Sequence, residues 1–306
     1  MSGHAEPAGD EPAASEPAAG GLAAGGLAAG PDAPEGAALP RRPGHPAPLG
    51  PGETVVLHDR KERRYLVTLR EGGQFGYHGG TLDHDRLLGA PEGVEVSASK
   101  GARLRALRPT AEDWTLKAPR GAQVVYPKDQ AMIVARGDIG PGCEVVEAGA
   151  GSGALTAALL RAVVPGGRVV SFERREDFAD VARRNVAERL GPVGEAWDLR
   201  VGEAAGALGG IPCDRVVLDL LEPWALLDDV VAALRPGGLL VAYTPTVPQV
   251  MRLHEGLEAT GAFAGGDTTE TMERGWNVKG LSVRPDHRMV AHTAFITVAR
   301  RVPEPG

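Results

Sequence analysis

Hydrophobic and polar residues alternate in short segments over the first third of the chain after residue 50. The segments TVVLHD (54–59) and RRYLVTL (63–69) flank one turn, and GVEVSAS (93–99) and ARLRALR (102–108) flank Lys100 and Gly101. Period-two alternation between turn residues is typical of β-hairpins. Two such hairpins predict a small β domain over residues 51–118.

The stretch between the two hairpins, residues 72–89, has the sequence GGQFGYHGGTLDHDRLLG. It has too many glycines for a regular element and is too long for a plain turn. We therefore expect a long loop without regular structure. Loops of this length inside compact domains are often functional.

From about residue 120 the pattern changes to apolar strands that alternate with amphipathic helices. Repeated strand–helix units build a parallel sheet with right-handed crossovers. The pattern therefore predicts an α/β domain over residues 119–302. Strands are expected at 145–150, 168–173, 197–203, 214–220, 239–245 and 292–302, and helices at 154–164, 176–190, 226–234 and 246–260, with a turn at RPGG (235–238).

The first 50 residues consist mainly of Ala, Gly, Pro and Glu, and the strings EPAA and GLAAG each occur twice. Such a segment cannot bury enough apolar surface to offset the entropy lost on ordering. We expect a disordered tail over residues 1–50.

The net charge is −7, but it is unevenly distributed. Residues 1–50 hold six acids and two bases, whereas residues 51–128 hold thirteen bases and ten acids, and residues 274–301 hold six bases and one acid. Local basic regions decide phosphate affinity more than the total charge does. The candidate phosphate contacts on the hairpins, which could also be a solvated charged face, are Arg60, Lys61, Arg63, Arg64, Arg103, Arg105 and Arg108.

The chain has only two cysteines, Cys143 and Cys213, and they are far apart in the sequence. This favours a reducing compartment and argues against a disulfide framework or a cysteine zinc site. No apolar run reaches the roughly 18 residues of a membrane helix, and the acidic N-terminus lacks the features of a secretory signal. We expect a cytoplasmic protein without a metal, since the eight histidines also lack the spacing of a metal site.

The stretch EVVEAGAGSGALT (Glu144–Thr156) joins a strand to a helix through Gly149, Gly151 and Gly153. In an open parallel sheet the ligand binds beyond the carboxyl ends of the strands, so this loop is the expected site. A nucleoside-triphosphatase loop is excluded because no Lys-Ser or Lys-Thr pair follows it. A dinucleotide site stays possible, because Gly149, Gly151 and Ala154 fit its permissive pattern.

Four acids near the ends of four predicted strands favour S-adenosylmethionine instead. Glu147 lies two residues before Gly149, where it can orient the loop and attract a cationic sulfonium but would repel a pyrophosphate. At the ends of the next two strands, Glu173 can accept hydrogen bonds from ribose hydroxyls and Glu203 can accept one from an adenine amino group. Asp219 ends the fourth strand, next to the reactive centre.

Five motifs of this chain together resemble the bacterial and archaeal tRNA (adenine-N1)-methyltransferases that modify adenine 58 in the T loop. The resemblance covers roughly residues 52–302, and its most specific parts are YPKD and RGWNV. The motifs are PRGAQVVYPKD (119–129), VVEAGAGSGALTAALLRAV (145–163), ARRNV (182–186), VVLDLLEPW (216–224) and RGWNVKGLSVRP (274–285).

The resemblance implies a class I, Rossmann-like methyltransferase sheet, a small N-terminal β domain and a homotetramer that grips tRNA across subunits. Asp219 then faces both S-adenosylmethionine and the target base, as the catalytic residue, and Phe178 occupies a place where some relatives have a cofactor-contacting His. The remaining implied cofactor contacts are Glu147, Gly149, Gly151, Ser152, Gly153, Ala154, Leu155, Glu173 and Glu203, and the implied substrate contacts are Tyr77, His78 and Gln123.

The implied reaction is an in-line methyl transfer to N1 of adenine. N1 of the neutral base has a lone pair and no proton, so no strong base is needed. Asp219 would accept a hydrogen bond from the exocyclic amino group as the adenine becomes cationic, and the base must leave the tRNA core to react.

Three alternatives remain open from the residues alone. They are a class I methyltransferase that acts on protein or a small molecule, an NAD-dependent oxidoreductase, and a non-catalytic RNA-binding relative. Methylation of an exocyclic amino group is disfavoured, because DLLEPW (219–224) departs from the spacing of Pro and aromatic residues that such enzymes carry after the Asp.

Overall fold

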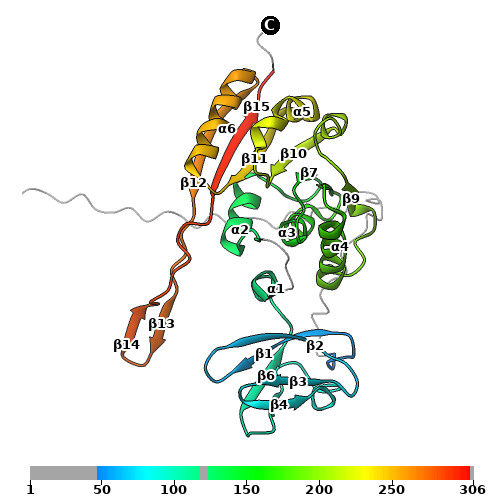
Figure 1. Cartoon of the computed structure of the whole chain (residues 1–306), viewed down its shortest axis with the longest axis vertical. Helices are drawn as coiled ribbons and strands as arrows, with labels where there is room; N and C mark the ends of the chain where they lie inside the picture. The colour runs from blue at the N-terminus through cyan, green and yellow to red at the C-terminus, as the bar shows by residue number, and fades with distance from the viewer. Residues whose placement is uncertain (1–46, 118–122, 304–306) are drawn as a thin grey trace, which may run out of the picture. The chain divides into compact units, whose positions relative to one another are not determined.

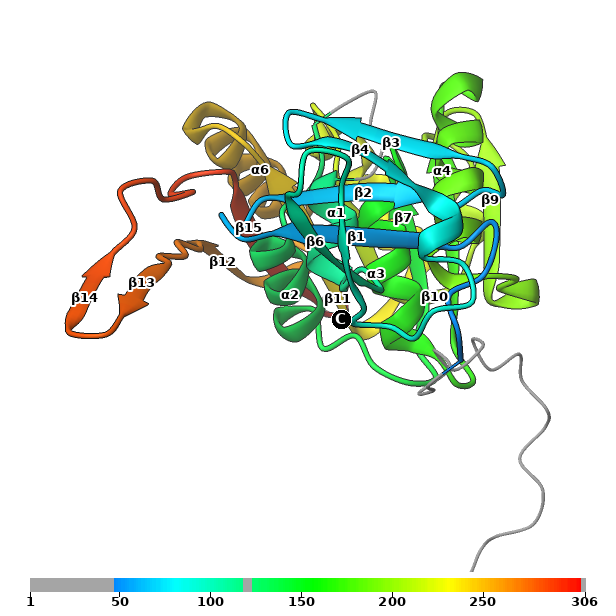
Figure 2. The same cartoon turned by 90° about the horizontal axis from the view of Figure 1, so that it is seen from below.

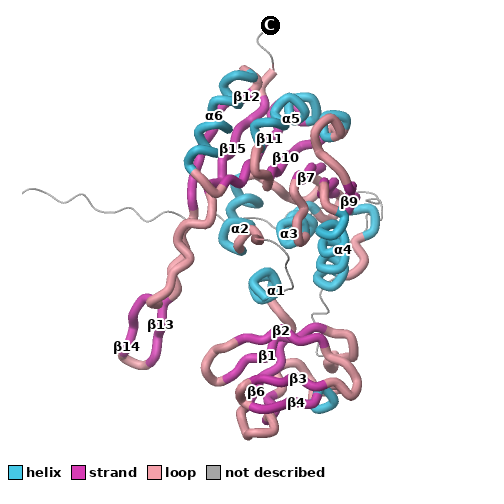
Figure 3. Tube along the Cα trace, viewed as in Figure 1, coloured by secondary structure: helices cyan, strands magenta, loops and turns pink. Residues whose placement is uncertain are grey.

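The structure, a computed structural model, describes residues 47–117 and 123–303 (Figures 1 and 3). The expected tail lies outside the described residues as far as residue 46. Leu49, which was expected in the tail, is 1% exposed, and its backbone N–H donates to the carbonyl of Ala90 at 2.8 Å. The N-terminal β domain therefore begins before residue 51.

Both predicted hairpins of this domain are confirmed. They are β1 (Thr54–Asp59) with β2 (Arg64–Thr68), and β5 (Glu95–Ser97) with β6 (Arg103–Leu107). Because β1 also pairs with β6, the hairpins form one four-stranded antiparallel sheet in the order β2-β1-β6-β5. The alternating apolar residues of these strands, such as Leu57 and Leu104, are fully buried in its core.

The expectation of an irregular loop over residues 72–89 is wrong. This stretch contains a third hairpin, β3 (Gln74–Tyr77) and β4 (Gly80–Asp83), followed by the short helix η1 (His84–Arg86). Gly80 turns the chain at a φ of +113°, which suits a glycine. Leu82 is buried and Phe75 packs against the same core, so two apolar anchors hold the hairpin despite its glycines.

The second sheet has seven strands in the order β12-β15-β11-β10-β7-β8-β9 (Figure 1). The five strands from β11 to β9 are parallel, as predicted. β15 runs antiparallel to β11, and the unexpected β12 pairs antiparallel with β15. The strands are β7 (Glu144–Ala148), β8 (Arg168–Glu173), β9 (Trp197–Val201), β10 (Cys213–Leu218), β11 (Leu234–Thr244), β12 (Phe263–Glu270) and β15 (Phe295–Arg301).

β11 begins five residues before the predicted position, because the RPGG segment is an irregularity inside the strand. Leu234 pairs with Cys213, and regular pairing resumes between Leu239 and Arg215. The predicted turn at RPGG is therefore a bulge between two paired parts of one strand.

Helices cover both faces of the seven-stranded sheet. Val145 and Val217 pack on the face shared with α2 and α3, whereas their neighbours Val146 and Val216 pack on the face shared with α5 and α6. Strands buried on both faces explain the continuous apolar runs in the sequence. The helices are α1 (Ala111–Lys117), α2 (Pro127–Arg136), α3 (Ala154–Val163), α4 (Glu176–Leu190), α5 (Leu227–Ala233) and α6 (Val247–Thr260), with short 3-10 turns η2 (Gly194–Ala196), η3 (Leu208–Gly210) and η4 (Pro223–Leu226).

The YPKD motif starts α2 and forms a buried polar cluster. Asp129 is fully buried and pairs with the ammonium of Lys128 at 2.7 Å. Its other carboxylate oxygen accepts from Thr293 at 2.6 Å and from the phenol of Tyr243 at 3.1 Å. The cluster thereby ties the start of α2 to the end of β11 and to the residues before β15.

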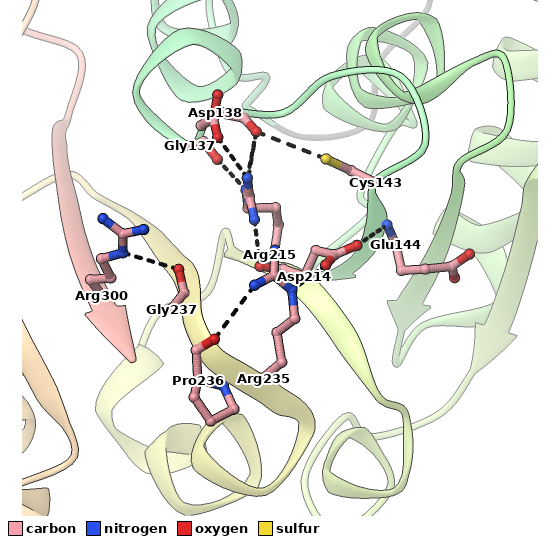
Figure 4. Close-up of polar contacts among 10 residues, drawn as sticks. All are labelled: Gly137, Asp138, Cys143, Glu144, Asp214, Arg215, Arg235, Pro236, Gly237 and Arg300. Atoms are coloured by element: carbon pink, nitrogen blue, oxygen red, sulfur yellow. Dashed lines mark hydrogen bonds and ion pairs between the residues drawn. The ribbon is translucent and has the colours of Figure 1, made fainter. Parts of the chain in front are cut away.

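A second polar network lies at the amino-terminal ends of the strands (Figure 4). The buried guanidinium of Arg215 on β10 donates to the carbonyl of Gly137 at 2.6 Å and to the carboxylate of Asp138 at 2.8 Å. Asp214 accepts from the backbone N–H of Glu144 at 2.9 Å. These contacts hold the connection between α2 and β7 at the edge opposite to the strands' carboxyl ends.

Two further strands, β13 (Trp276–Lys279) and β14 (Ser282–Pro285), were not predicted. They form a separate two-stranded sheet within the RGWNVKGLSVRP motif (Figure 2). We call residues 272–290, which include this hairpin, the arm. Its large apolar side chains are 44–105% exposed and comprise Met272, Trp276, Val278, Leu281, Val283, Met289 and Val290.

Candidate functional site

A cavity of about 580 Å³ lies beyond the carboxyl ends of the parallel strands. The chain runs from β7 outward to β8 and β9, and then returns to β10 on the other side of β7. The crevice at such a switch point is the usual ligand site of an open parallel sheet. The lining residues include Gln123, Gly149, Gly151, Glu173, Phe178, Glu203 and Asp219 from the sequence prediction.

The glycine loop passes closer to the β10 end than any side chain would allow. Gly149 has a φ of +96°, and a Cβ at this position would overlap the carbonyl oxygen of Asp219. Its N–H donates to the carbonyl of Phe172 at 2.9 Å, and the N–H of Asp219 donates to the carbonyl of Ala148 at 2.9 Å. The ends of β7, β8 and β10 are thus joined by backbone contacts.

Glu173 ends β8 and is held by two backbone donors. One carboxylate oxygen accepts from the N–H of Gly151 at 2.8 Å and the other from the N–H of Arg175 at 3.0 Å. The side chain is 8% exposed and lines the cavity. A carboxylate fixed in this way keeps lone pairs free for ligand hydroxyl groups.

Asp219 directly follows β10 and is partly exposed, with the cavity at its side. Burial raises its pKa to about 7, and the nearby charge of Glu173 adds to that shift. A cation bound beside Asp219 would favour the ionised carboxylate.

Glu147 does not line the cavity, and the cofactor contact that the resemblance implies for it stays a prediction. It is 0% exposed on β7, and its carboxylate accepts from the hydroxyls of Thr156 and Ser171, both at 2.6 Å. Burial raises its pKa to about 7, with Asp219 and Glu173 adding to the shift. Glu147 thus joins β7 to α3, which carries Thr156, and to β8, which carries Ser171.

Three other predicted residues lie on the cavity wall. Glu203 is exposed two residues beyond β9. Phe178 on α4 is 9% exposed, with the Arg175 guanidinium 4.1 Å from its ring centroid. Gln123 is exposed and precedes α2. Apolar and acidic groups thus share the wall.

Six further predicted residues are not on the wall. Ser152, Ala154 and Leu155 are at most 7% exposed, and Gly153 packs against Ala182 of α4. The phenol of Tyr77 on β3 is buried among Tyr65 and Phe75, and His78 follows in the turn. The roles implied for these residues stay predictions.

The cavity also contains residues that the sequence did not single out. Most of them directly follow β8, β9 or β10, so strand ends were the signal that could have found them. They are Phe172, Arg174, Arg175, Gly202, Ala204, Ala205, Leu220, Leu221, Glu222, Ala225 and Leu226.

The described residues form neither a metal site nor a membrane-spanning helix. Within residues 47–117 and 123–303, no group of three His, Cys, Asp or Glu side chains could hold a metal ion. No helix in the same ranges has the length and apolarity to cross a membrane.

Two family models match the chain. The model described as "tRNA methyltransferase complex GCD14 subunit" matches residues 104–293, and the one described as "TrmI-like N-terminal" matches residues 48–96. The chain belongs to the TrmI and GCD14 family of tRNA methyltransferases.

Two curated relatives of this family are matched over nearly their whole length. The tRNA (adenine(58)-N(1))-methyltransferase TrmI of Thermus thermophilus is 40% identical over 256 residues, which are 81% of this chain and 96% of the relative. The tRNA (adenine(57)-N(1)/adenine(58)-N(1))-methyltransferase TrmI of Methanocaldococcus jannaschii is 33% identical over 275 residues, or 82% and 95% of the two chains.

Two solved structures are similar throughout. A SAM-dependent O-methyltransferase from Thermotoga maritima has a TM-score of 0.78 at 30% identity and covers 84% of this chain and 96% of its own. The tRNA (m1A58) methyltransferase TrmI from Aquifex aeolicus has a TM-score of 0.75 at 28% identity, with 84% and 100% covered. The predicted fold, a class I S-adenosylmethionine-dependent methyltransferase sheet with a small N-terminal β domain, is confirmed.

The buried carboxyl groups predict an unusual pH dependence of stability. Glu147 and Asp219 have folded-state pKa values of about 7, above their ordinary values near 4. Between pH 4 and pH 7 the folded chain therefore binds more protons than the unfolded chain. The free energy of unfolding should therefore fall as pH rises from about 4 to about 7, by about 1.4 kcal/mol per pH unit for each proton.

Urea unfolding at pH 5, 6, 7 and 8 would measure this slope. Glu147→Gln should make the slope shallower, because the amide cannot ionise but can still accept from both hydroxyls. Glu176→Gln, at an exposed position, should leave it unchanged. An identical slope in Glu147→Gln and the unsubstituted chain would contradict the assignment.

Proposed function

We propose that this chain transfers a methyl group from S-adenosylmethionine to N1 of adenine 58 in the T loop of tRNA, in the cytoplasm. The observation that carries the proposal is the set of carboxylates at the strand ends, in a chain 40% identical over most of its length to the Thermus thermophilus enzyme of that activity. The alternative of a dinucleotide is disfavoured, since Glu173, Glu203 and Asp219 line one cavity and would repel a pyrophosphate.

The residues of the cavity fit S-adenosylmethionine. Gly151 lines the cavity, and the space that a Cβ would take there is open. The carboxylate of Glu173 is already oriented by two N–H donors, as ribose hydroxyls require. Glu203 would accept from the adenine amino group, and Phe178 would pack against the ligand. When bound, the cofactor supplies the methyl group and its positively charged sulfur.

Asp219 is the residue that we assign to catalysis. Its backbone N–H donates to the Ala148 carbonyl of β7, which fixes the position of Asp219 on the cavity wall. It would accept a hydrogen bond from the exocyclic amino group of the adenine, and it stabilises the positive charge that develops on the base. We assign Gln123, on the same wall, to contact with the target base.

Most of the basic hairpin residues that the sequence offered as phosphate contacts are engaged in ion pairs. Arg63 pairs with Asp59 and Arg64 with Asp113, both at 2.7 Å, whereas Arg103 and Arg105 pair with Glu95. Arg108, paired with Glu53 and Glu92, has a side chain only 13% exposed and holds the domain together. We therefore assign tRNA phosphate contacts to exposed Arg60 and Lys61 and to the arm cations Arg274, Lys279, Arg284 and Arg288.

Substitution of Asp219 tests the assignment. Asp219→Ala should lower kcat on unmodified tRNA about 100- to 1000-fold, as loss of one electrostatic partner does, with little change in tRNA affinity. In the unsubstituted enzyme kcat/KM for S-adenosylmethionine, which reports the free enzyme, should rise as pH increases toward about 7, because the ionised form of Asp219 then becomes populated.

The assay is transfer of labelled methyl groups, with the product mapped to its nucleotide by mass spectrometry. Asp267→Ala, whose carboxylate on β12 is 85% exposed, is the control. A tRNA with G58 should not react. Full turnover by Asp219→Ala would refute the catalytic role, and methylation at another position, on oxygen or not at all would refute the proposed substrate.

A homotetramer is the second part of the proposal, and the arm supports it. Trp276 pairs with Pro285 and Val278 with Val283, so these four side chains share one face of the hairpin. The other face carries Asn277, Arg284, Lys279 and Ser282. A lone two-stranded hairpin is only marginally stable in water, so cover by another copy of the chain would stabilise its exposed apolar face.

Light scattering and native mass spectrometry test this contact. Val278→Asp should shift the protein toward smaller assemblies, because it buries a charge in the proposed interface. Ser282→Asp, on the opposite face of the same hairpin, should keep the assembly of the unsubstituted chain. Equal masses for the two variants would refute a contact through this face, and a monomeric unsubstituted chain would refute the tetramer.

A further inference from the structure

Leu221 is an anomaly within the candidate site. Its side chain is 77% exposed, although it lies two residues from Asp219 and lines the cavity. Leu220 before it packs against the main core, whereas Glu222 after it is exposed and Pro223 is buried at the start of η4. Among the described large apolar residues that line the cavity, Leu221 is the exposed one.

The turn that presents Leu221 is held from both ends. The N–H of Asp219 is bonded to β7, and the carbonyl of Leu221 accepts from the side-chain amide of Gln249 at 2.9 Å. Gln249 is 8% exposed on α6, and its own oxygen accepts from Thr246 at 2.6 Å. The hydrogen bond from the buried Gln249 amide holds the Leu221 carbonyl, and this limits the directions that the Leu221 side chain can take.

We infer that Leu221 is a substrate-binding residue, whose side chain packs on one face of the target adenine when the base is turned out of the tRNA. This inference rests on the proposed function. A base leaving the stack loses contacts on both faces, at a cost of a few kcal/mol. An apolar side chain beside Asp219 restores one of these contacts, while Asp219 accepts from the amino group at the base's edge.

Gln249 has a positioning role in the same inference. Gln249 is 8% exposed and does not line the cavity, and its amide bonds to Thr246 and to the Leu221 carbonyl, so we assign it no contact with the base. Its contribution passes through the Leu221 carbonyl. Loss of Gln249 should therefore have little further effect once the Leu221 side chain is gone.

The test compares three variants under steady-state kinetics with unmodified tRNA. Leu221→Ala should lower kcat/KM for tRNA by about tenfold or more, as removal of apolar contact at a binding site does, and Leu221→Met should restore most of it. Met251→Ala removes an apolar side chain that is 58% exposed on α6 and outside the cavity, and should match the unsubstituted enzyme.

Calorimetric titration with S-adenosylmethionine separates base contact from cofactor contact. The dissociation constant should stay within about twofold in Leu221→Ala; a loss equal to that in kcat/KM would place Leu221 on the cofactor and overturn the inference. So would unchanged tRNA kinetics in Leu221→Ala. If the unsubstituted enzyme does not methylate tRNA at all, the proposed function fails instead.

A double-mutant cycle tests Gln249. Gln249→Ala alone should lower kcat/KM for tRNA, and the double variant with Leu221→Ala should be scarcely worse than Leu221→Ala. Additive losses would show that Gln249 acts independently of Leu221 and would refute the positioning role. Circular dichroism of each variant would establish that it is folded.

Discussion

The carboxylate of Glu173, held between the N–H groups of Gly151 and Arg175, is the contact on which the site depends. It joins the glycine loop after β7 to the end of β8, and the carbonyl of Glu173 in turn accepts from the N–H of Gly202 after β9 at 2.9 Å. Together with the contact of Gly149 on the Asp219 carbonyl, this brings the ends of four strands into one fixed rim. The rim is held by the chain's own hydrogen bonds and backbone contacts, which keeps the ordering cost of binding small.

The same rim concentrates negative charge in a partly dry cavity. Asp219 and Glu147 have raised pKa values because burial disfavours their charged forms and because each lies near other carboxylates. Repulsion among these carboxylates is unfavourable for the folded chain, and a positively charged ligand would relieve it. The clustered carboxylates lower the stability of the folded chain at the candidate site, and such clusters with perturbed pKa values are common in active sites.

Much of the sheet could be predicted from the sequence, because strands buried on both faces leave long apolar runs such as VVLDL. The three glycines and the acids could also be identified from the sequence, because they lie at or near the ends of these apolar runs. The burial of Glu147 was not, because the sequence does not show that Thr156 and Ser171 would enclose it. Whether an acid near a strand end faces the cavity or the core is decided by the side chains that pack on it from other elements.

The hairpin β3–β4 and the strands β12 to β14 were missed for different reasons. In β3–β4, glycines hid two apolar anchors, Phe75 and Leu82. In β12, the sequence FAGGDTTE has glycines and exposed polar residues, because it is an edge strand with a bulge between Gly265 and Asp267. Leu221 gave no signal, since only the structure shows that its turn is pinned by Gln249.

Calorimetric titration of S-adenosylmethionine into the full chain and into Glu173→Ala tests the central claim most directly. The unsubstituted chain should bind the cofactor and not NAD, and Glu173→Ala should bind it at least about tenfold more weakly, as expected for lost hydrogen bonds to a charged group. Glu176→Ala, three residues away and outside the cavity, should bind normally. Equal affinity in Glu173→Ala and the unsubstituted chain would contradict the account.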